Sequence, residues 1–222
     1  MAVILVAGTT KGVGFEIVRA LRARDDTVIG FGRSEDAAPK LEELGARLIS
    51  ADARDTRDVA TAFREAGPID AVVCTIGGKT DETHLADWPA ARNFTDASQV
   101  AGVKRFIFIS AIGCGDSRAV MPAPVLERIG EALDAKDQAE NYLRASGLDW
   151  TIVRPGGLES GSATGNGFLT EDQGVLGGID RADVAQLVVQ CLVSGNAVRR
   201  TLAAVDRGKV RTGNGYDEYQ LA

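Results

Sequence analysis

The sequence predicts an α/β fold in which helices cover both faces of one doubly wound parallel sheet. Short apolar runs alternate with longer segments of helical periodicity along the chain, which is typical of parallel strands joined by crossover helices. Most of the short runs are apolar at consecutive positions, as strands buried on both faces are. We therefore expect the strand order 3-2-1-4-5-6-7 and a small carboxyl-terminal lobe for a substrate.

The elements follow in order along the chain. Strands are predicted at Val3–Ala7, Thr27–Gly32, Ala46–Ser50, Ala71–Thr75, Arg105–Ser110, Trp150–Arg154 and Leu202–Val205. Helices are predicted at Val13–Arg24, Ala37–Leu44, Thr56–Glu65, Ala90–Ala101, Val125–Ser146 and Arg181–Val193. Asp55 is placed to cap the third helix, and Gly102 and Gly147 to end the fourth and fifth. Asp180, with Asp183 three residues on, resembles a capping arrangement for the last helix.

The chain shows no fixed repeat and no linker rich in Pro or Ser, so we expect residues 1–222 to form a single domain. Two segments break the alternating pattern. Residues 159–178 are rich in Gly, Ser and Thr, and are predicted to form a long loop that acts as a lid or is a plain surface excursion. Residues 207–222 are predicted to be a weakly docked polar tail.

Composition excludes several classes of partner. The 25 Lys and Arg against 31 Asp and Glu give a formal charge of -6, which disfavours nucleic acid and anionic membrane surfaces. No stretch approaches the roughly 20 consecutive apolar residues of a membrane span. Three cysteines and one histidine offer no metal-ligand spacing, so we expect no metal site. We expect a cytoplasmic monomer or homodimer that acts on a small molecule.

A glycine-rich turn follows the first predicted strand and opens the first helix. Glycine permits a tight turn and close approach to a diphosphate, while free N–H groups and the helix dipole attract negative charge. This context is the one that the dinucleotide-binding motif of the Rossmann fold requires, and a purely structural turn is the alternative. The predicted diphosphate-binding residues are Gly8, Thr10, Lys11, Gly12, Val13 and Gly14.

The end of the second predicted strand indicates which dinucleotide binds. A free ribose 2′-hydroxyl usually meets an acidic residue at this place, whereas a 2′-phosphate needs donors. Here the sequence offers Arg33 and Ser34, and Lys11 can add a second cation. NADP is therefore the predicted cofactor. In the alternative, the basic side chains face solvent and Glu35 binds the ribose.

Further motifs extend through most of the chain: residues 51–55 (ADARD), 74–78 (CTIGG), 100–106 (VAGVKRF), 109–113 (ISAIG), Lys136 with 139–140 (AE), 146–158 (SGLDWTIVRPGGL) and 180–185 (DRADVA). With the glycine turn, they resemble the atypical short-chain dehydrogenase/reductase superfamily. The resemblance is to its small NAD(P)H-binding members, similar to biliverdin-IXβ/flavin reductase and NmrA-like proteins.

This resemblance implies roles for individual residues. Asp52 and Ala53 would contact the adenine, and Thr75, Ile76 and Gly77 would line the adenosine ribose and the diphosphate. Pro155, Gly156, Gly157 and Leu158 would border the nicotinamide. Ser110 would lie beside the nicotinamide, and Lys136 would hold the nicotinamide ribose hydroxyls, so these two are the predicted catalytic residues.

The chain departs from the family at one position. In the commonest family mechanism a tyrosine four residues before the lysine transfers the substrate proton, but here that position is Ala132. A conjugated acceptor such as a flavin, quinone or tetrapyrrole can take its proton from water. We therefore expect an NADP(H)-dependent oxidoreductase that reduces such an acceptor. A non-catalytic NADP(H) redox sensor is the alternative, and a sugar-nucleotide epimerase or dehydratase is less favoured.

Simpler roles stay open for several polar residues. Ser110 can form a hydrogen bond at a strand end, and Lys136 can pair with Glu140 one helical turn on. Asp116 and Ser117 lie in the loop expected near the nicotinamide and are candidates for substrate contact.

Four other residues are expected to have no part in catalysis. His84 is interpreted as a solvent-facing loop residue rather than an acid near the cleft. Cys114 lacks neighbouring cations that would favour a thiolate. Tyr142 and Tyr216 are expected to pack, because their spacing does not match that of the missing tyrosine.

Overall fold

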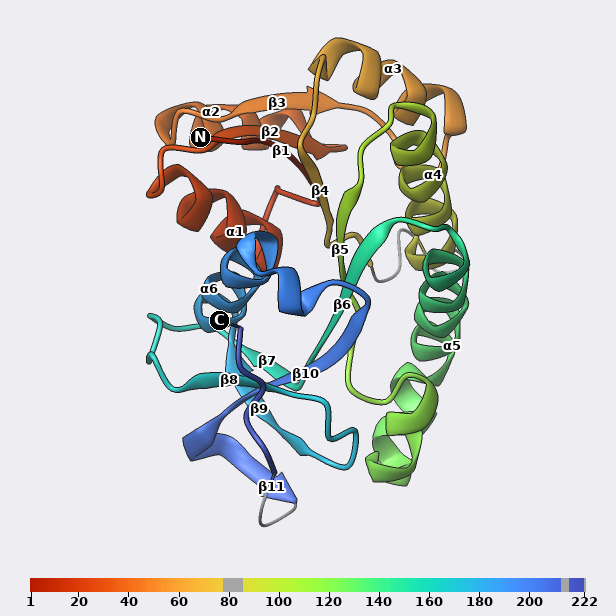
Figure 1. The fold of residues 1–222 in the computed structure, drawn as a ribbon, viewed down its shortest axis with the longest axis vertical. Coiled ribbons are helices and arrows are strands. Elements are labelled where there is room, and N and C mark those ends of the chain that lie inside the picture. Colours follow the sequence, from red (N-terminus) through yellow and green to blue (C-terminus); the bar gives the residue numbers. More distant parts are fainter. Residues whose placement is uncertain (78–85, 213–215, 222) are drawn as a thin grey trace.

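The computed structural model describes residues 1–77, 86–212 and 216–221. Its main sheet has eight strands in the order β3-β2-β1-β4-β5-β6-β10-β8 (Figure 1). The strands are β1 (Val3–Ala7), β2 (Thr27–Gly32), β3 (Arg47–Ser50), β4 (Ala71–Cys74), β5 (Arg105–Ile109), β6 (Asp149–Pro155), β8 (Gly167–Thr170) and β10 (Arg200–Asp206). All neighbours are parallel except β10 and β8. The predicted α/β fold and strand order are confirmed, with β10 as the seventh strand and β8 added at the edge.

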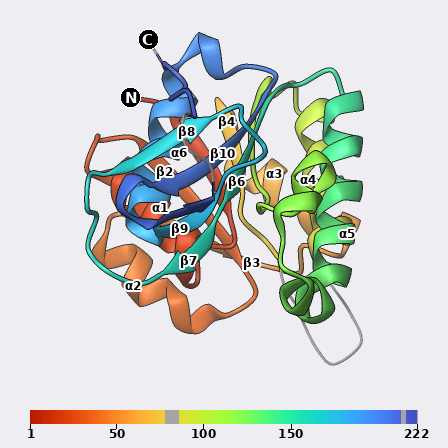
Figure 2. The same ribbon diagram turned by 90° about the horizontal axis from the view of Figure 1, so that it is seen from below.

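Among the described residues, six helices cover the sheet: α1 (Gly12–Arg22), α2 (Ala38–Glu43), α3 (Thr56–Ala66), α4 (Asp87–Val100), α5 (Ala123–Ala145) and α6 (Arg181–Val193). Helices α1, α2 and α6 lie on one face, and α3, α4 and α5 on the other (Figures 1 and 2). Short 3-10 helices follow β2 (Glu35–Ala37), β5 (Gly115–Val120), α6 (Gly195–Ala197) and β10 (Arg207–Lys209).

The continuous apolar run of β1 is explained by two cores. Successive side chains of a strand point to opposite faces, and Val6 packs in the core under α1 and α6 while Leu5 packs in the core under α3, α4 and α5. In this second core Phe31 of β2 meets Phe94 of α4 edge to face, with ring centroids 5.0 Å apart. Both faces of the sheet are therefore dry, and the carboxyl ends of its strands are where ligands have access.

Three of the predicted helix boundaries are confirmed and one capping prediction is wrong. The Asp55 side chain accepts hydrogen bonds from the backbone N–H groups of Arg57 and Asp58 at the start of α3. Gly102 and Gly147 follow α4 and α5 with φ of +73° and +76°. Asp180 makes no side-chain cap to α6, because its carboxylate instead accepts a 2.5 Å hydrogen bond from Lys209.

The segment predicted as a long loop, 159–178, contains regular strands. Strand β8 lies within it, and it also holds the end of β7 (Gly157–Glu159) and the start of β9 (Leu176–Asp180). Strand β9 pairs with β7 and with β11 (Val210–Thr212) in a small second sheet. The prediction of a long irregular loop is thus wrong for much of this segment, because strands this short and rich in glycine leave no periodic pattern.

The carboxyl-terminal tail is attached more firmly than the sequence predicts. Strand β11 pairs antiparallel with β9. Tyr219 donates its backbone N–H to Leu169 O at 2.7 Å and its hydroxyl to Asn196 O at 2.6 Å. Glu218 forms an ion pair with Arg207, which holds the pKa of the Glu218 carboxyl below its usual value. The contacts with β9, Leu169 and Asn196 join the tail to the main body, and the Arg207–Glu218 pair links the two ends of the tail.

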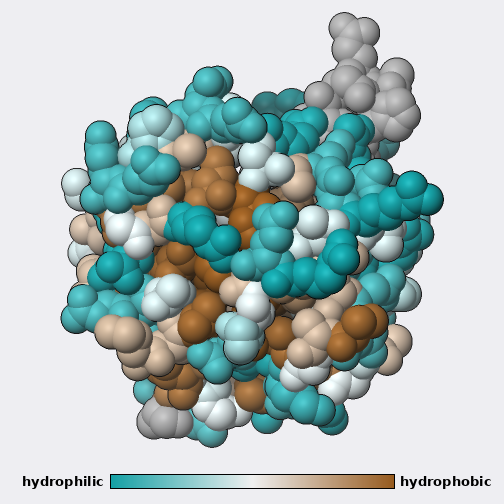
Figure 3. Space-filling model, turned by 90° about the horizontal axis from the view of Figure 1, so that it is seen from above, coloured by the Kyte–Doolittle hydropathy of each residue, from teal (hydrophilic) through white to brown (hydrophobic). Residues whose placement is uncertain are grey.

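The surface is mixed in character. Seen from above the view of Figure 1, apolar residues show near the middle of the face between bands of polar side chains (Figure 3). Within the part of the chain that the structure describes, no helix is long and apolar enough to cross a membrane.

Candidate active site

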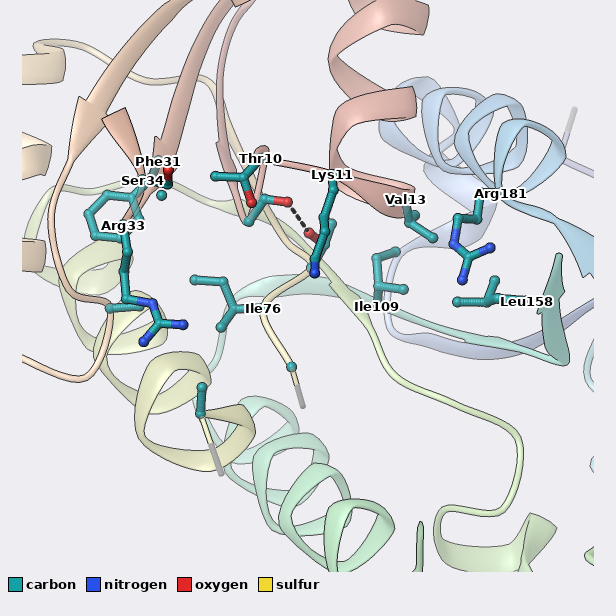
Figure 4. A pocket seen from close by; sticks show the side chains of 18 of the residues that line it. Thr10, Lys11, Val13, Phe31, Arg33, Ser34, Ile76, Ile109, Leu158 and Arg181 are labelled. Atoms are coloured by element: carbon teal, nitrogen blue, oxygen red, sulfur yellow. Dashed lines mark hydrogen bonds between the residues drawn. The ribbon is translucent and has the colours of Figure 1, made fainter. Parts of the chain in front are cut away.

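A cavity of about 740 Å³ opens at the carboxyl ends of the central parallel strands (Figure 4). Most of the predicted site residues line it: Gly8, Thr10, Lys11, Gly12, Val13, Gly14, Arg33, Ser34, Asp52, Ala53, Thr75, Ile76, Gly77, Ser110, Lys136 and Leu158. Phe31, Gly32, Ala86, Ile109, Ala111 and Arg181 line it as well. These residues come from the ends of β1 to β5, from β7 and from three helices, so the topology rather than local sequence brings them together.

The glycine turn fits the close approach of a ligand to the backbone. A Cβ on Gly14 would lie 2.1 Å from Gly8 O, and a Cβ on Gly8 would lie 2.6 Å from Thr75 Oγ1. Gly8 and Gly12 also adopt φ of +94° and +68°, which favour glycine. The turn therefore lies close against the end of β4, and the amino terminus of α1 is open to the cavity as a site for an anion.

Arg33 and Ser34 lie at one end of the cavity, beyond the end of β2 (Figure 4). The Ser34 hydroxyl donates to Asp36 at 3.2 Å. Glu35, the alternative ribose ligand, begins the short 3-10 helix and is not among the residues that line the cavity. The Arg33 guanidinium and the Ser34 side chain are thus the polar groups that the end of β2 offers to an adenosine ribose or its phosphate.

Asp52 lines the same end of the cavity and is held by its neighbour. Arg54 donates to both Asp52 carboxylate oxygens, with Nε 3.1 Å from Oδ1 and Nη2 2.7 Å from Oδ2. The hydrogen bond from the Arg54 side chain lowers the pKa of Asp52. The carboxylate is therefore ionised and fixed in place, where it is able to accept from a ligand amine.

Lys136 on α5 lines the cavity and pairs with a buried carboxylate that the sequence did not indicate. Its Nζ is 2.8 Å from Asp87 Oδ1, and the Asp87 side chain has no exposed surface. Nζ also donates to Ile109 O at 3.3 Å. The alternative pairing of Lys136 with Glu140 is wrong, because the Glu140 carboxylate accepts instead from Ser110, Arg144 and Arg154. These contacts fix the ammonium beside Gly77, where a Cβ would lie 2.9 Å from Nζ.

Ser110 follows β5 and is 5% exposed. Its hydroxyl donates to Glu140 Oε1 at 2.5 Å. Glu140 is fully buried and also accepts from Arg154, whose Nε lies 3.0 Å from Oε1 and whose Nη2 lies 2.7 Å from Oε2. Burial would lower the pKa of Arg154, but hydrogen bonds to Glu140 outweigh this and raise it. Ser110 is thus attached to a buried ion pair.

The comparison with known proteins agrees with this architecture. The profile of a family described as NAD(P)H-binding matches residues 8–194, most of the chain. The chain belongs to the NAD(P)H-binding family. This match begins at the first glycine of the turn and includes α6.

Solved structures of family-like proteins superpose closely on the chain. The anaerobilin reductase ChuY from Escherichia coli O157:H7 is 32% identical, with a TM-score of 0.84 over 92% of this chain and 97% of that one. An NAD-dependent epimerase/dehydratase-type protein from Bacillus halodurans is 27% identical, with a TM-score of 0.80 over 93% and 94%.

Curated relatives in the NAD(P)H-binding family carry varied names. A Bacillus subtilis (strain 168) protein named "Uncharacterized sugar epimerase YhfK" is 33% identical and is matched over 89% of this chain and 91% of its own length. The photosystem II assembly factor Ycf39 of Synechocystis is 29% identical over 71% of this chain and 45% of its own length. The match thus shows the family and the fold, while the names do not agree on one activity.

Three predicted nicotinamide neighbours do not line the cavity of this NAD(P)H-binding protein. Pro155 is the buried last residue of β6. Gly156 packs against the second sheet, since a Cβ there would lie 2.3 Å from Gly177 O. Gly157 begins β7. Only Leu158 of this run reaches the cavity, so the bend between β6 and β7 serves to bring that side chain to the site.

The other candidates in the loop after β5 have structural contacts. Ser117 is fully buried and bonds within the loop, accepting from Gly113 N at 2.8 Å and donating to Cys114 O at 2.7 Å. Asp116 pairs with Arg154 at 2.5 Å. Burial raises the pKa of Cys114 to about 11, so this thiol is protonated at neutral pH. The proposed substrate contact of Ser117 is therefore wrong, because no part of its side chain reaches solvent.

Both tyrosines considered as replacements for the missing one are engaged elsewhere. Tyr142 donates its hydroxyl to Asp96 at 2.6 Å on the outer face of α5. Tyr216 stacks on Phe168 with ring centroids 4.7 Å apart. Within the described ranges no tyrosine lines the cavity, and His84 lies outside the described residues.

Three residues of the site were missed by the sequence reasoning. Asp87 and Glu140 are carboxylates in helices, and nothing in their local sequence distinguishes them from solvated charges. Arg181 begins α6 and lines the cavity. Its position directly after a buried strand, in the motif at 180–185, was the available signal, because side chains at the carboxyl ends of strands face the ligand edge of the sheet.

Proposed function

We propose that the protein is an NADP(H)-dependent reductase that transfers hydride to a conjugated acceptor such as a flavin, a quinone or a tetrapyrrole. The observation that carries this proposal is the continuity of the cavity. It reaches from Arg33 and Ser34, past the open amino terminus of α1, to Ser110 and Leu158. A single elongated ligand with a diphosphate in its middle suits such a cavity.

The residues present suit NADPH in particular. The glycine turn leaves room for the diphosphate beside free N–H groups of α1, and Arg33 offers a planar fork of donors to a 2′-phosphate. Lys136, held by Asp87, is able to donate to the nicotinamide ribose hydroxyls. Bound NADPH supplies the hydride, from its dihydronicotinamide ring.

The protein's own part in the reaction is to position the acceptor and to exclude side reactions. The Ser110 hydroxyl donates its hydrogen bond to Glu140, so the Ser110 oxygen is left to accept a hydrogen bond from an N–H or O–H group of a ligand. Ala132 has no proton to give. A proton for the reduced acceptor therefore comes from water. Water suffices because the anion formed by hydride transfer to a conjugated acceptor is stabilised by resonance.

The relatives support a reductase more than an epimerase. ChuY, named as an anaerobilin reductase, is 32% identical over nearly its whole length. The relative named as a sugar epimerase is similarly close, but epimerase chemistry of this family oxidises an alcohol and uses the tyrosine that Ala132 replaces. A cytoplasmic location, a monomeric or homodimeric state and a single domain over residues 1–222 remain predictions.

The test is to mix the purified protein with NADPH and, separately, FMN, a water-soluble quinone and biliverdin, while following the absorbance of the reduced nicotinamide. We expect oxidation of NADPH with at least one acceptor, and a loss of at least about tenfold in Lys136→Ala, which loses its ammonium donor. Tight binding of NADPH without turnover across the panel would instead favour the redox sensor.

A further inference from the structure

Arg181 lies at the end of the cavity opposite Arg33. It is the first residue of α6, directly after β9, and its guanidinium extends towards Leu158 and Ile109 (Figure 4). Its Nε is 3.8 Å from the place that a Cβ on Gly12 would occupy. A positive charge thus lies at the end where the acceptor enters, on the element that follows the small second sheet.

This guanidinium has no carboxylate partner within the described residues. Nη1 donates to the Ser160 hydroxyl at 2.8 Å. The acidic side chains that neighbour Arg181 or Ser160 in the chain have other partners. Glu159 and Asp180 both accept from Lys209, at 2.9 and 2.5 Å, and Asp183 accepts from the backbone of residues 164 and 165.

The charges of a bound dinucleotide have partners elsewhere in the cavity. Arg33 lies at the far end for the 2′-phosphate, and Lys11 and the amino terminus of α1 lie between, for the diphosphate (Figure 4). Arg181 is therefore an additional cation, whose Nε lies near Gly12 of the turn and whose guanidinium extends towards the acceptor end. A partly buried guanidinium that is oriented by a neighbour is well suited to bind a carboxylate or phosphate through two parallel hydrogen bonds.

We propose that Arg181 binds an anionic oxygen group of the acceptor, so that the natural acceptor is a conjugated ring system with a carboxylate or phosphate side chain. This inference rests on the proposed reductase function and deepens it. Ser160 is a positioning residue, since its hydroxyl accepts from the guanidinium and holds it towards the cavity. The ring system itself is selected by the apolar Leu158 and Ile109.

The experiment compares acceptors that differ only in the anionic group. FMN is paired with riboflavin, which lacks the phosphate, and biliverdin with its dimethyl ester, which lacks free carboxylates. Each is measured for kcat/KM with NADPH, and for binding to the protein saturated with NADP+ by fluorescence quenching or calorimetry. The variants are Arg181→Gln and Arg181→Lys. The matched control is Arg200→Gln, which removes an arginine paired with Glu171 at half-exposed positions outside the cavity.

We expect the parent protein to prefer the anionic member of at least one pair by about tenfold or more, the value of one charge-assisted interaction. Arg181→Gln should remove this preference, Arg181→Lys should retain part of it, and Arg200→Gln should leave it intact. The pair that shows the preference identifies the group as phosphate or carboxylate.

Two outcomes would overturn the inference. One is an unchanged preference in Arg181→Gln. The other is a loss of NADP+ affinity in that variant with no change in the ratio between paired acceptors, which would assign Arg181 to the cofactor. Failure of the reductase function is a separate result, because binding of the paired acceptors to the NADP+ complex is measured without turnover.

Discussion

Ser110 Oγ lies 2.5 Å from Glu140 Oε1, and the serine is the donor of this hydrogen bond. Glu140 has no exposed surface and Arg154 only 1%, so the serine beside the cavity is tied to an ion pair in the interior. A carboxylate of α5 and a guanidinium of β6 thereby determine how the residue after β5 is oriented towards the cavity. The serine hydroxyl has one proton, which it donates in this hydrogen bond, so towards a ligand the serine oxygen acts as an acceptor.

Glu140→Gln tests whether this ion pair stabilises the fold. The amide keeps the shape of the carboxylate but leaves the buried Arg154 with only the exposed Asp116 as a charged partner. We expect the free energy of unfolding to fall by about 3–5 kcal/mol, as for other buried pairs that lose one member. Urea denaturation measures it. Glu171→Gln, which removes a half-exposed pair with Arg200, should cost less than about 1 kcal/mol; equal effects of the two variants would contradict the prediction.

Ser110→Ala separates a role at the ligand from a role in the fold. Arg154 keeps both oxygens of Glu140 in this variant, so the loss of stability should be only about 1 kcal/mol, the usual value of one hydrogen bond. Turnover with the best acceptor should fall by about tenfold or more, because an oriented hydrogen-bond acceptor is lost. Ser98→Ala is the control, since Ser98 bonds to Phe94 O inside α4. If Ser110→Ala turned over as fast as the parent protein, the role of Ser110 would be only structural, at the end of the strand.

Arg33→Ala tests the cofactor assignment. The guanidinium lies where a 2′-phosphate would bind, and charge-assisted hydrogen bonds contribute about 1.5–3 kcal/mol. We expect the ratio of NADH to NADPH dissociation constants to fall by about tenfold or more. Calorimetry at one fixed ionic strength measures both constants, because salt screens such contacts. Arg64→Ala, on the exposed face of α3, should leave the ratio unchanged. An unchanged ratio in Arg33→Ala would mean that the 2′-phosphate binds elsewhere or that the cofactor is NAD.

The sheet was predictable because its strands are buried on both faces, and the cofactor turn because glycines recur where a strand meets a helix. Pairing between distant side chains was not predictable. Lys136 has an acidic residue one helical turn away, which is the natural partner to expect from sequence, yet Asp87 at the start of α4 is nearer in space. Which side of α5 faces the cavity depends on how the helix packs, and this is a tertiary property.

The carboxyl-terminal lobe was the least predictable part for a different reason. Its strands are short, so neither alternation nor continuous apolarity has room to show. Asp180 stands in the sequence where a helix cap is expected, but its carboxylate forms an ion pair with Lys209, which follows β10. Tertiary contacts therefore overrode the local signal at the residue just before Arg181.

Gly14→Ala tests the close approach of α1 to the end of β4. The new Cβ would lie 2.1 Å from Gly8 O and 2.7 Å from Thr75 Oγ1, and the first of these is backbone that has no rotamer to change. The helix must move, so we expect a loss of stability of about 1–3 kcal/mol and weaker binding of NADPH. Thermal unfolding and calorimetry measure the two effects. Gly195→Ala is the control, because nothing lies within 4 Å of its added Cβ; similar losses in both variants would show that the effect is not specific to the turn.

Because of the three buried thiols, the stability of the fold should vary with pH in the alkaline range. Burial raises the pKa of Cys74 and Cys114 from 9.0 to about 11, and that of Cys191 from 9.0 to about 12. In the unfolded chain each thiol ionises near its ordinary pKa, so between that pH and the folded value the unfolded chain holds fewer protons than the folded one. Stability must then fall as the pH rises through this window.

We expect the free energy of unfolding to decrease from about pH 9 to about pH 11, by up to about 1.4 kcal/mol per pH unit for each thiol. Urea denaturation at a series of pH values measures the slope, and Cys191→Ala isolates one thiol. The alanine variant should be less stable at neutral pH, because it leaves a small cavity, but its stability should fall less steeply with pH since it has one fewer group to ionise on unfolding. Lysines and tyrosines titrate in both proteins and cancel in the comparison. Identical slopes for the two proteins would mean that Cys191 ionises at the same pH whether the chain is folded or not.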